Sequence, residues 1–210
     1  MIILIEPQYL PSIEYLCTIS LCKEIILEGK EHFPKQTSRN RCHINTSHGV
    51  KMLTVPLAER HGKILTEEVQ LEPGIKWRNN HWRSIESAYR KAPYFDYYFE
   101  ELKRILFFDH KLLLDLNRDL LSFCLRSLGL QIPISVSVSY QKSLTNNVFD
   151  LRSVISDKKP FTSRQFYRSQ PYYQVFGSEF ASNLSFIDLL FCEGPRSLEL
   201  IKASKALPNE

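Results

Sequence analysis

Glycine is scarce in this 210-residue sequence, and none of its seven glycines falls into a G-x-G-x-x-G or G-x-x-x-x-G-K-[ST] pattern. A glycine-rich loop that cradles phosphates is therefore excluded. The H-E-x-x-H motif and the paired Cys/His spacings of zinc sites are missing as well. We therefore expect no dinucleotide or other cofactor and no metal site.

Cysteines are few and contain no C-x-x-C pair. The five are Cys17, Cys22, Cys42, Cys124 and Cys192. An odd number of widely spaced cysteines matches reduced thiols in a cytosolic protein better than a disulfide framework. The apolar start, residues 1–5, meets Glu6 and Pro7 at once, so it is too short for a signal peptide or a membrane span. We expect a cytoplasmic protein without a membrane span.

Charge of one sign does not dominate. Lysine and arginine number 27 against 23 acidic residues, the net charge is +4, and no long basic run occurs. Binding to nucleic acid depends on neutralising many phosphates, so this balance argues against a nucleic-acid partner. The length suits one domain, predicted over residues 1–205, with 206–210 as a frayed end.

Short apolar runs near the start predict a parallel β-α-β unit. Residues 1–5 form a buried strand, Ser12 is a candidate N-cap for a short helix, and residues 25–27 form a second strand. Two further segments, 51–56 and 131–140, alternate like half-buried strands. An antiparallel meander on the same sheet is expected from residues 41–44, 52–55 and 68–71.

From Trp77 the apolar period changes to 3.6 residues, which predicts helices over 77–93, 96–107 and 109–128. Asp109 is the expected cap of the third helix, and Gly129 its end. The fold class is therefore α/β: a single domain whose mixed sheet is covered mainly by this mid-chain helical layer.

The remainder of the chain is more polar and less periodic. The residue pattern predicts a turn-rich connection over 145–159 and a long ordered loop over 160–181. Two short helices are expected after it, over 184–191 and from Pro195 to about residue 203.

The densest polar stretch is Lys35-Gln36-Thr37-Ser38-Arg39-Asn40-Arg41-Cys42-His43. Lys35, Arg39 and Arg41 suit a phosphate, sugar phosphate or carboxylate, and Gln36 or Asn40 can donate to a developing oxyanion. In an extended segment Arg39 and Arg41 point to the same face. The alternatives are a solvated loop and structural salt bridges to the helical layer.

Several stretches together resemble the WbqC-like family, in the form common in Bacteroidetes. They are Tyr9-Leu10-Pro11 with Glu14-Tyr15-Leu16, the 35–42 block, His81 to Tyr89, Pro93 to Tyr98, Asp150-Leu151-Arg152, Tyr173 to Phe176, and Asn183 to Phe191 with Glu193-Gly194-Pro195. Where the wider family opens with His-Gln-Pro, this chain has Ile5-Glu6-Pro7, and Ser12 replaces a common Trp. The resemblance implies a place in O-antigen and other surface-polysaccharide biosynthesis and a suggested glycine-transferase role, but no established catalytic residues.

Two residues are candidates for catalysis. His81 lies at the edge of an apolar helical stripe and is either a general base or a partly buried histidine bonded to a carbonyl. Asp188 begins a helix, where it either caps or faces a ligand. Cys42 beside His43 is more readily a small buried thiol than a nucleophile.

Further candidates to bind a ligand lie later in the chain. Tyr89 can stack on a sugar, although core packing is an alternative. Asp150 and Arg152 either pair with each other or line a cleft. Tyr173 and Gln174 form an aromatic and amide platform suited to a sugar, or pin a loop over the core. The expected partner is a small molecule: a sugar, a sugar phosphate or a nucleotide sugar.

Two functions from different classes remain open. The first is an aminoacyl (glycine) or acyl transferase acting on an amino sugar or nucleotide-linked sugar, with Arg39 and Arg41 holding an anionic group and His81 removing the acceptor proton. The second is a non-enzymatic ligand-binding or scaffolding component of polysaccharide assembly. Convergence of the candidate residues on one pocket favours the first, and dispersal into separate salt bridges favours the second.

Overall fold

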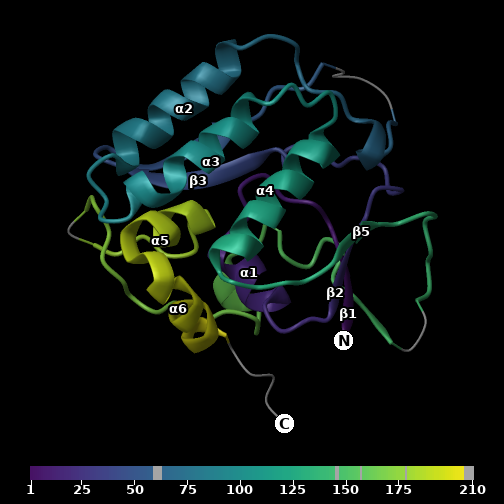
Figure 1. Cartoon of the computed structure of the whole chain (residues 1–210). Helices are drawn as coiled ribbons and strands as arrows, with labels where there is room; N and C mark the ends of the chain where they lie inside the picture. The colour runs from purple at the N-terminus through teal and green to yellow at the C-terminus, as the bar shows by residue number, and fades with distance from the viewer. Residues whose placement is uncertain (59–62, 145–146, 157, 178, 206–210) are drawn as a thin grey trace.

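The predicted β-α-β unit is present at the start of the chain. The computed structural model describes residues 1–58, 63–144, 147–156, 158–177 and 179–205 (Figure 1). Strand β1 (Ile2–Ile5) pairs in parallel with β2 (Glu24–Leu27), and helix α1 (Ile13–Ile19) connects them. Ser12 caps α1 by accepting a hydrogen bond from the Tyr15 amide.

The parallel sheet has the strand order β5-β2-β1-β6. Strand β5 (Ile134–Val136) confirms a strand within 131–140. Strand β6 (Val148–Asp150), however, lies in the segment expected to be only a turn-rich connection, and that expectation was wrong. A three-residue edge strand is too short to show a period of two, and its Phe149 is 53% exposed, so no buried apolar pattern marked it.

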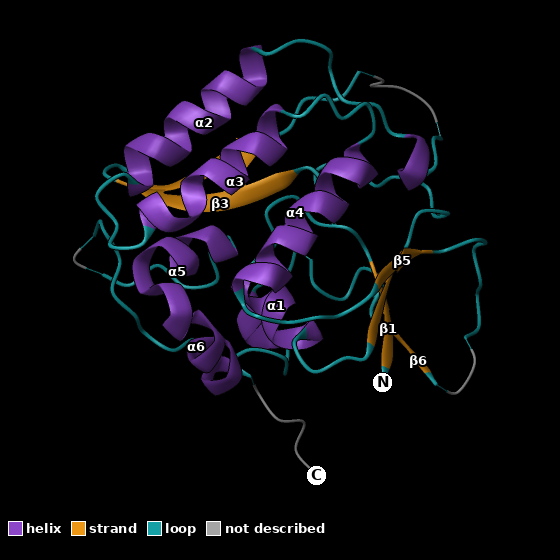
Figure 2. Ribbon diagram, in the orientation of Figure 1, coloured by secondary structure: helices purple, strands orange, loops and turns teal. Residues whose placement is uncertain are grey.

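Strands β3 (Arg41–Thr46) and β4 (Gly49–Thr54) form an antiparallel hairpin that is a sheet of its own. Figure 2 shows it behind α2 and α3, apart from the parallel strands. The expected meander on one sheet was therefore wrong. Residues 66–68 form a 3₁₀ turn that is closed by the Glu68 side chain, which accepts from the Leu65 amide at 3.2 Å. The chain is nonetheless α/β with parallel and antiparallel strands, as predicted.

The predicted helical layer is confirmed as α2 (Lys76–Tyr89), α3 (Phe95–Phe107) and α4 (Leu113–Ser127). Asp109 does not cap α4, because backbone bonds between residues 69–71 and 111–113 keep the approach to the helix extended. The exposed Asp109 carboxylate binds Lys111 instead, at 2.6 Å.

The last two helices are α5 (Phe186–Glu193) and α6 (Ser197–Ser204), both of which pack against α1. They are drawn in yellow beside α1 in Figure 1. The core runs from the inner face of the parallel sheet, with Ile3, Ile5, Ile25 and Leu27, to the aromatic side chains of α2 and α5. The expected frayed end, 206–210, lies outside the described residues.

Gly194, which ends α5, has φ +52°, and a Cβ at this position would overlap the ring carbons of Tyr94. We expect Gly194→Ala to lower the free energy of unfolding by about 2–4 kcal/mol, because it adds a steric clash to backbone strain. Gly129→Ala is the matched control: its φ is +68° and its surroundings are open, so about 1 kcal/mol is expected. Urea unfolding of both variants measures the difference, and equal losses would contradict the Tyr94 clash.

Candidate functional site

A narrow polar pocket lies where four segments meet: the loop after β1, the start of β3, the loop after β6 and the start of α5. It encloses about 30 Å³, which is room for about two water molecules. The residues that line it are Gln8, Tyr9, Leu10, Ser12, Glu14, Ser38, Arg41, Cys42, His43, Ile155, Arg164, Asn183 and Ser185. We call it the Arg41 pocket.

Backbone hydrogen bonds fix the walls of the Arg41 pocket. The starts of α1 and α5 are joined by a bridge between Ser12 and Ser185, and the Ile13 amide donates to the Leu184 carbonyl at 3.0 Å. The Ser185 amide donates to the carbonyl of His43 in β3 at 2.8 Å. Segments far apart in the sequence are thereby held in one rigid frame, as a preorganised site requires.

Two residues of the pocket have backbone conformations that are unusual for their type. Leu10 has φ +43° and Asn183 has φ +54°. The Asn183 side chain compensates for its strain by accepting from the Glu14 amide at 3.0 Å, whereas the buried Leu10 has no comparable polar group. Strained residues of this kind concentrate at functional sites.

One wall of the pocket is a buried ion pair. Glu14 is fully buried, and the Arg164 guanidinium donates to both of its carboxylate oxygens at 2.6 Å. The Asn183 amide adds a third bond to the carboxylate, at 3.1 Å. A carboxylate is costly to bury unless hydrogen-bond donors replace the water that it loses. These three bonds supply the donors for Glu14.

Two polar groups in the pocket are buried without a hydrogen-bond partner among the described residues. They are Nε of Arg41 and Oγ of Ser185, and Ser185 as a whole residue is 2% exposed. Buried polar groups are normally paired, and an orphan indicates a missing water, ion or ligand. Both residues line the Arg41 pocket, which makes them candidates to contact a ligand there.

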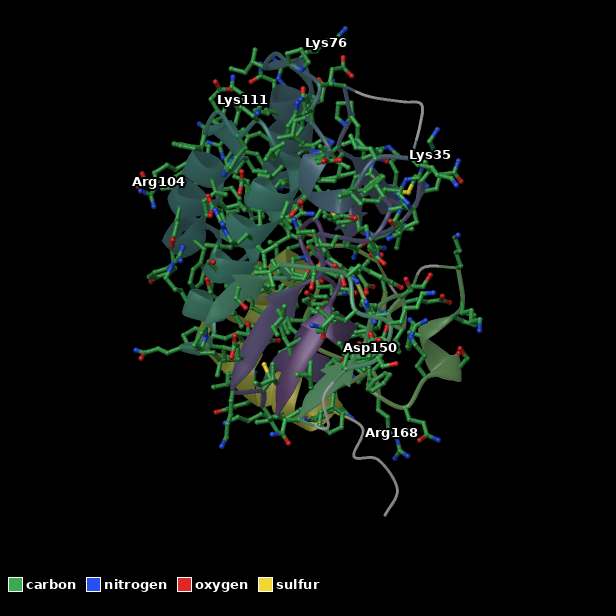
Figure 3. All side chains as sticks on the ribbon, turned by 90° about the vertical axis from the view of Figure 1, so that its right-hand side faces the viewer. Lys35, Lys76, Arg104, Lys111, Asp150 and Arg168 are labelled. Atoms are coloured by element: carbon green, nitrogen blue, oxygen red, sulfur yellow. The ribbon has the colours of Figure 1, made fainter. Side chains whose placement is uncertain are left out.

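The residues of the polar stretch at 35–43 differ in their exposure and in their hydrogen-bond partners. Lys35 and Gln36 are exposed on the loop before β3, and Figure 3 shows Lys35 at the periphery. Arg39 is buried and forms an ion pair with Glu31, and the Asn40 amide donates to the Val55 carbonyl at 3.0 Å. Of the ten predicted ligand-binding residues, all of them described, Arg41 alone lines the pocket.

His81 is buried between two hydrogen bonds. Its Nε2 lies 3.1 Å from the Thr54 carbonyl, and its Nδ1 lies 2.8 Å from the Tyr9 hydroxyl. A carbonyl only accepts, so the neutral ring carries its proton on Nε2, and Nδ1 accepts from Tyr9. Both nitrogens are engaged, and burial lowers the pKa of His81 to about 4. Its catalytic role remains a prediction.

Three other predicted residues do come together, inside the protein. The buried Asp188 carboxylate accepts from the Tyr89 hydroxyl at 2.8 Å, the Tyr172 hydroxyl at 2.5 Å and the Gln174 amide at 2.9 Å. Burial raises the pKa of Asp188, while these donors oppose the shift. Tyr89 and His81 are eight residues apart on α2, or about 12 Å. The Asp188 cluster and His81 are therefore separate.

The remaining candidates lie at the surface. Arg152 donates to Asp150 at 2.9 and 2.5 Å and to Glu28 at 3.0 Å, so these residues pair at the end of β6, where Figure 3 labels Asp150. The hydrogen bonds from Arg152 lower the pKa of Asp150. Tyr173 is exposed beside Gln174 and donates its amide to Glu193 at 3.1 Å.

Sequence reasoning missed Glu14, Arg164, Asn183 and Ser185 as residues of one site. Glu14 carried a usable signal: it is a single carboxylate in a short helix whose other positions are apolar or small, and a buried carboxylate requires a donor partner. The partner, Arg164, is 150 positions away, and no local pattern marks it. Within the described residues, no group of three or more His, Cys, Asp or Glu side chains is placed to hold a metal ion.

The model of the WbqC-like protein family matches residues 6–165 of this chain, which is most of its length. The chain belongs to the WbqC-like protein family. The match covers the whole Arg41 pocket except Asn183 and Ser185, which lie on the C-terminal side of residue 165.

A relative of this WbqC-like chain is the uncharacterized protein Rv1507c of Mycobacterium tuberculosis. It is 30% identical over 142 residues, which cover 66% of this chain and 60% of that protein. No solved structure matches the chain. Among the described helices, none is long and apolar enough to cross a membrane.

The buried His81 predicts a distinct pH dependence of stability. Between pH 6.5 and about 4 the unfolded chain binds a proton at this residue while the folded protein does not, so unfolding is favoured as the pH falls. Over this range the wild type loses about 3 kcal/mol from His81. In His81→Gln, whose amide can keep both hydrogen bonds, this loss disappears. Urea unfolding at several pH values measures it, and parallel curves for the two proteins would contradict it.

Proposed function

We propose that this WbqC-like protein binds a small carboxylate, carbonyl or phosphate group in the Arg41 pocket, and that it is a glycyl or acyl transferase. Its acceptor would be an amino sugar or a nucleotide-linked sugar in surface-polysaccharide (O-antigen) biosynthesis, in the cytoplasm. The observation that carries the proposal is the pair of orphaned buried groups, Arg41 Nε and Ser185 Oγ, in one pocket. The five cysteines are free, which supports a reducing compartment.

The position of the pocket supports a ligand site. Strand β1 has β2 on one side and β6 on the other, so the strand order changes direction at β1. In parallel sheets, ligands bind beyond the carboxyl ends of the strands at such a switch point. The loop that follows β1 contributes Gln8, Tyr9, Leu10 and Ser12 to the pocket.

The size of the pocket favours the end of a ligand over a whole nucleotide sugar. Room for about two water molecules suits a carboxylate or a glycyl group, and the rest of a ligand would extend outside. Arg41 supplies charge for an anionic group, and Ser185 supplies a hydroxyl donor. Arg164 is already engaged with Glu14 and shapes the wall.

A transfer step can be written with the groups of this pocket. The amine or hydroxyl of the sugar attacks the carbonyl carbon of an activated acyl ester, a C–N or C–O bond forms, and the bond to the leaving group breaks. His43, two positions from Arg41 on the same face of β3, would take the acceptor proton. Arg41 would stabilise the oxyanion. In this reaction the activated ester would have to come from outside the pocket.

The second candidate function is ligand binding or scaffolding without catalysis. The specific observation that favours it is the dispersal of the predicted catalytic residues: His81 and Asp188 lie in separate buried networks, and their polar atoms are already bonded. Under this alternative the Arg41 pocket binds the same group but no product forms.

Removal of the Arg41 charge tests both candidates. We expect thermal-shift and calorimetric titrations against acetate, glycine, sugar phosphates and nucleotide sugars to find a ligand whose affinity falls about tenfold in Arg41→Gln, because a charge-assisted bond is lost. Ser185→Ala, a smaller change that preserves packing, should weaken the same ligand severalfold. Arg168→Gln, which changes an exposed arginine that does not line the pocket, is the control (Figure 3).

Mass spectrometry of a nucleotide amino sugar incubated with glycyl or acyl esters separates the candidates. A mass gain that is lost in Arg41→Gln and His43→Gln supports transfer, whereas binding without product supports the second candidate. Equal affinities of the wild type and Arg41→Gln for every ligand would reject the Arg41 pocket as the site.

A further inference from the structure

A second hollow lies between the turn of the β3–β4 hairpin and α2, and shares no lining residue with the Arg41 pocket. In Figure 1 the hairpin passes beneath α2. The hollow has a volume of about 590 Å³, within the range of about 300–1,000 Å³ that is typical of small-molecule sites. We call it the hairpin groove.

The hairpin groove is electropositive. Lys51 of β4 and Arg83 of α2 line it from opposite sides, and His48 lies in the turn. Among the described residues that line it, none is acidic, and neither Lys51 nor Arg83 forms an ion pair within the described part of the chain. This differs from Arg39, Arg152 and Arg164, each of which is paired with a carboxylate. Unneutralised cations around a hollow attract an anion.

One side of the groove is also held in place by a hydrogen bond. The Lys51 ammonium donates to the Ser84 hydroxyl at 2.9 Å, and that hydroxyl donates to the Asn80 carbonyl at 2.9 Å. Lys51 is thus anchored across the groove to α2 and keeps further ammonium protons for a ligand, since an ammonium has three. The charge is positioned before any ligand arrives, which lowers the entropy cost of binding.

The remaining lining determines the class of ligand. Ser47, Ser84 and Ser87 present hydroxyl groups, and among the described lining residues none is Phe, Tyr or Trp, while His48 contributes one imidazole ring. A nucleobase would have only the His48 imidazole to stack on, whereas hydroxyl groups suit the hydroxyls of a sugar, and the cations suit a phosphate. We propose that the hairpin groove binds a phosphorylated sugar, with the phosphate between Lys51 and Arg83 and the sugar along the serines of α2.

The inference is independent of the function proposed for the Arg41 pocket, because it concerns other residues on another surface. Glucose 1-phosphate is the probe, and glucose is the uncharged control. We expect glucose 1-phosphate to bind with an affinity that falls about tenfold in Arg83→Gln and severalfold in Lys51→Gln, and that falls further as salt is raised. Both side chains are exposed, so neither variant should unfold the protein.

The measurements are calorimetric titration and amide chemical shifts of residues 46–51, 84 and 87. Arg168→Gln is the matched control and should bind like the wild type. Three results would overturn the inference: no binding of glucose 1-phosphate at about 10 mM, equal binding of glucose, or an affinity that falls in Arg41→Gln but not in Arg83→Gln. The last result would place the sugar phosphate in the Arg41 pocket and leave the proposed function standing.

Discussion

The ion pair between Glu14 and Arg164 joins helix α1 to the loop after β6, two segments that are 150 positions apart in the sequence. Glu14 lies on α1, all of whose residues are buried, so its carboxylate has no access to water. Removing a carboxylate from water costs several kcal/mol unless donors replace the solvent. Arg164 and Asn183 supply those donors from segments about 150 and 170 positions away. The loop after β6 and the start of α5 are thereby drawn onto α1, and the Arg41 pocket exists because these segments meet there.

The carboxyl ends of the parallel strands hold a second set of buried charges, and these are mutually satisfied. Glu28 accepts from Arg152 at 3.0 Å and from Ser137 at 2.7 Å, and Glu6 accepts from the Ser153 amide at 2.7 Å. Burial raises the pKa of Glu6, while the charge of Arg39 opposes the shift. At the sheet edge itself, then, the polar groups stabilise one another. Arg41 and Ser185, whose buried Nε and Oγ lack a described partner, line the pocket next to the loop that follows β1.

The sequence predicted the helices and strands that are long or have a strong hydrophobic period. It did not predict elements whose boundaries depend on hydrogen-bond partners far away in the chain. The β-α-β unit and α2 to α4 follow from periodicity, because each is a local pattern that burial reinforces. Strand β6 and the start of α4 do not, since β6 is defined by the pairing of Val148 with Ile2, and the start of α4 by that of Leu113 with Val69. For the site, the 35–43 stretch contains Arg41, which lines the pocket, but Glu14, Arg164 and Ser185 join it only in the folded chain.

Arg39 and Arg41 illustrate why composition alone cannot assign a ligand site. Both are arginines in one polar stretch, two positions apart, and the expectation placed them on one face. Arg39 precedes β3 and meets the carboxylate of Glu31, so its charge is neutralised within the protein. Arg41 begins β3 and lines a pocket; its Nε, like that of Arg39, is buried without a described partner, but no described carboxylate pairs with Arg41. The same side chain forms a structural ion pair in one position and lines a pocket in the other, and the difference lies in whether a carboxylate from another segment reaches it. The same criterion separates Lys51 and Arg83, which line a hollow without an acid, from the paired cations at the ends of the parallel strands.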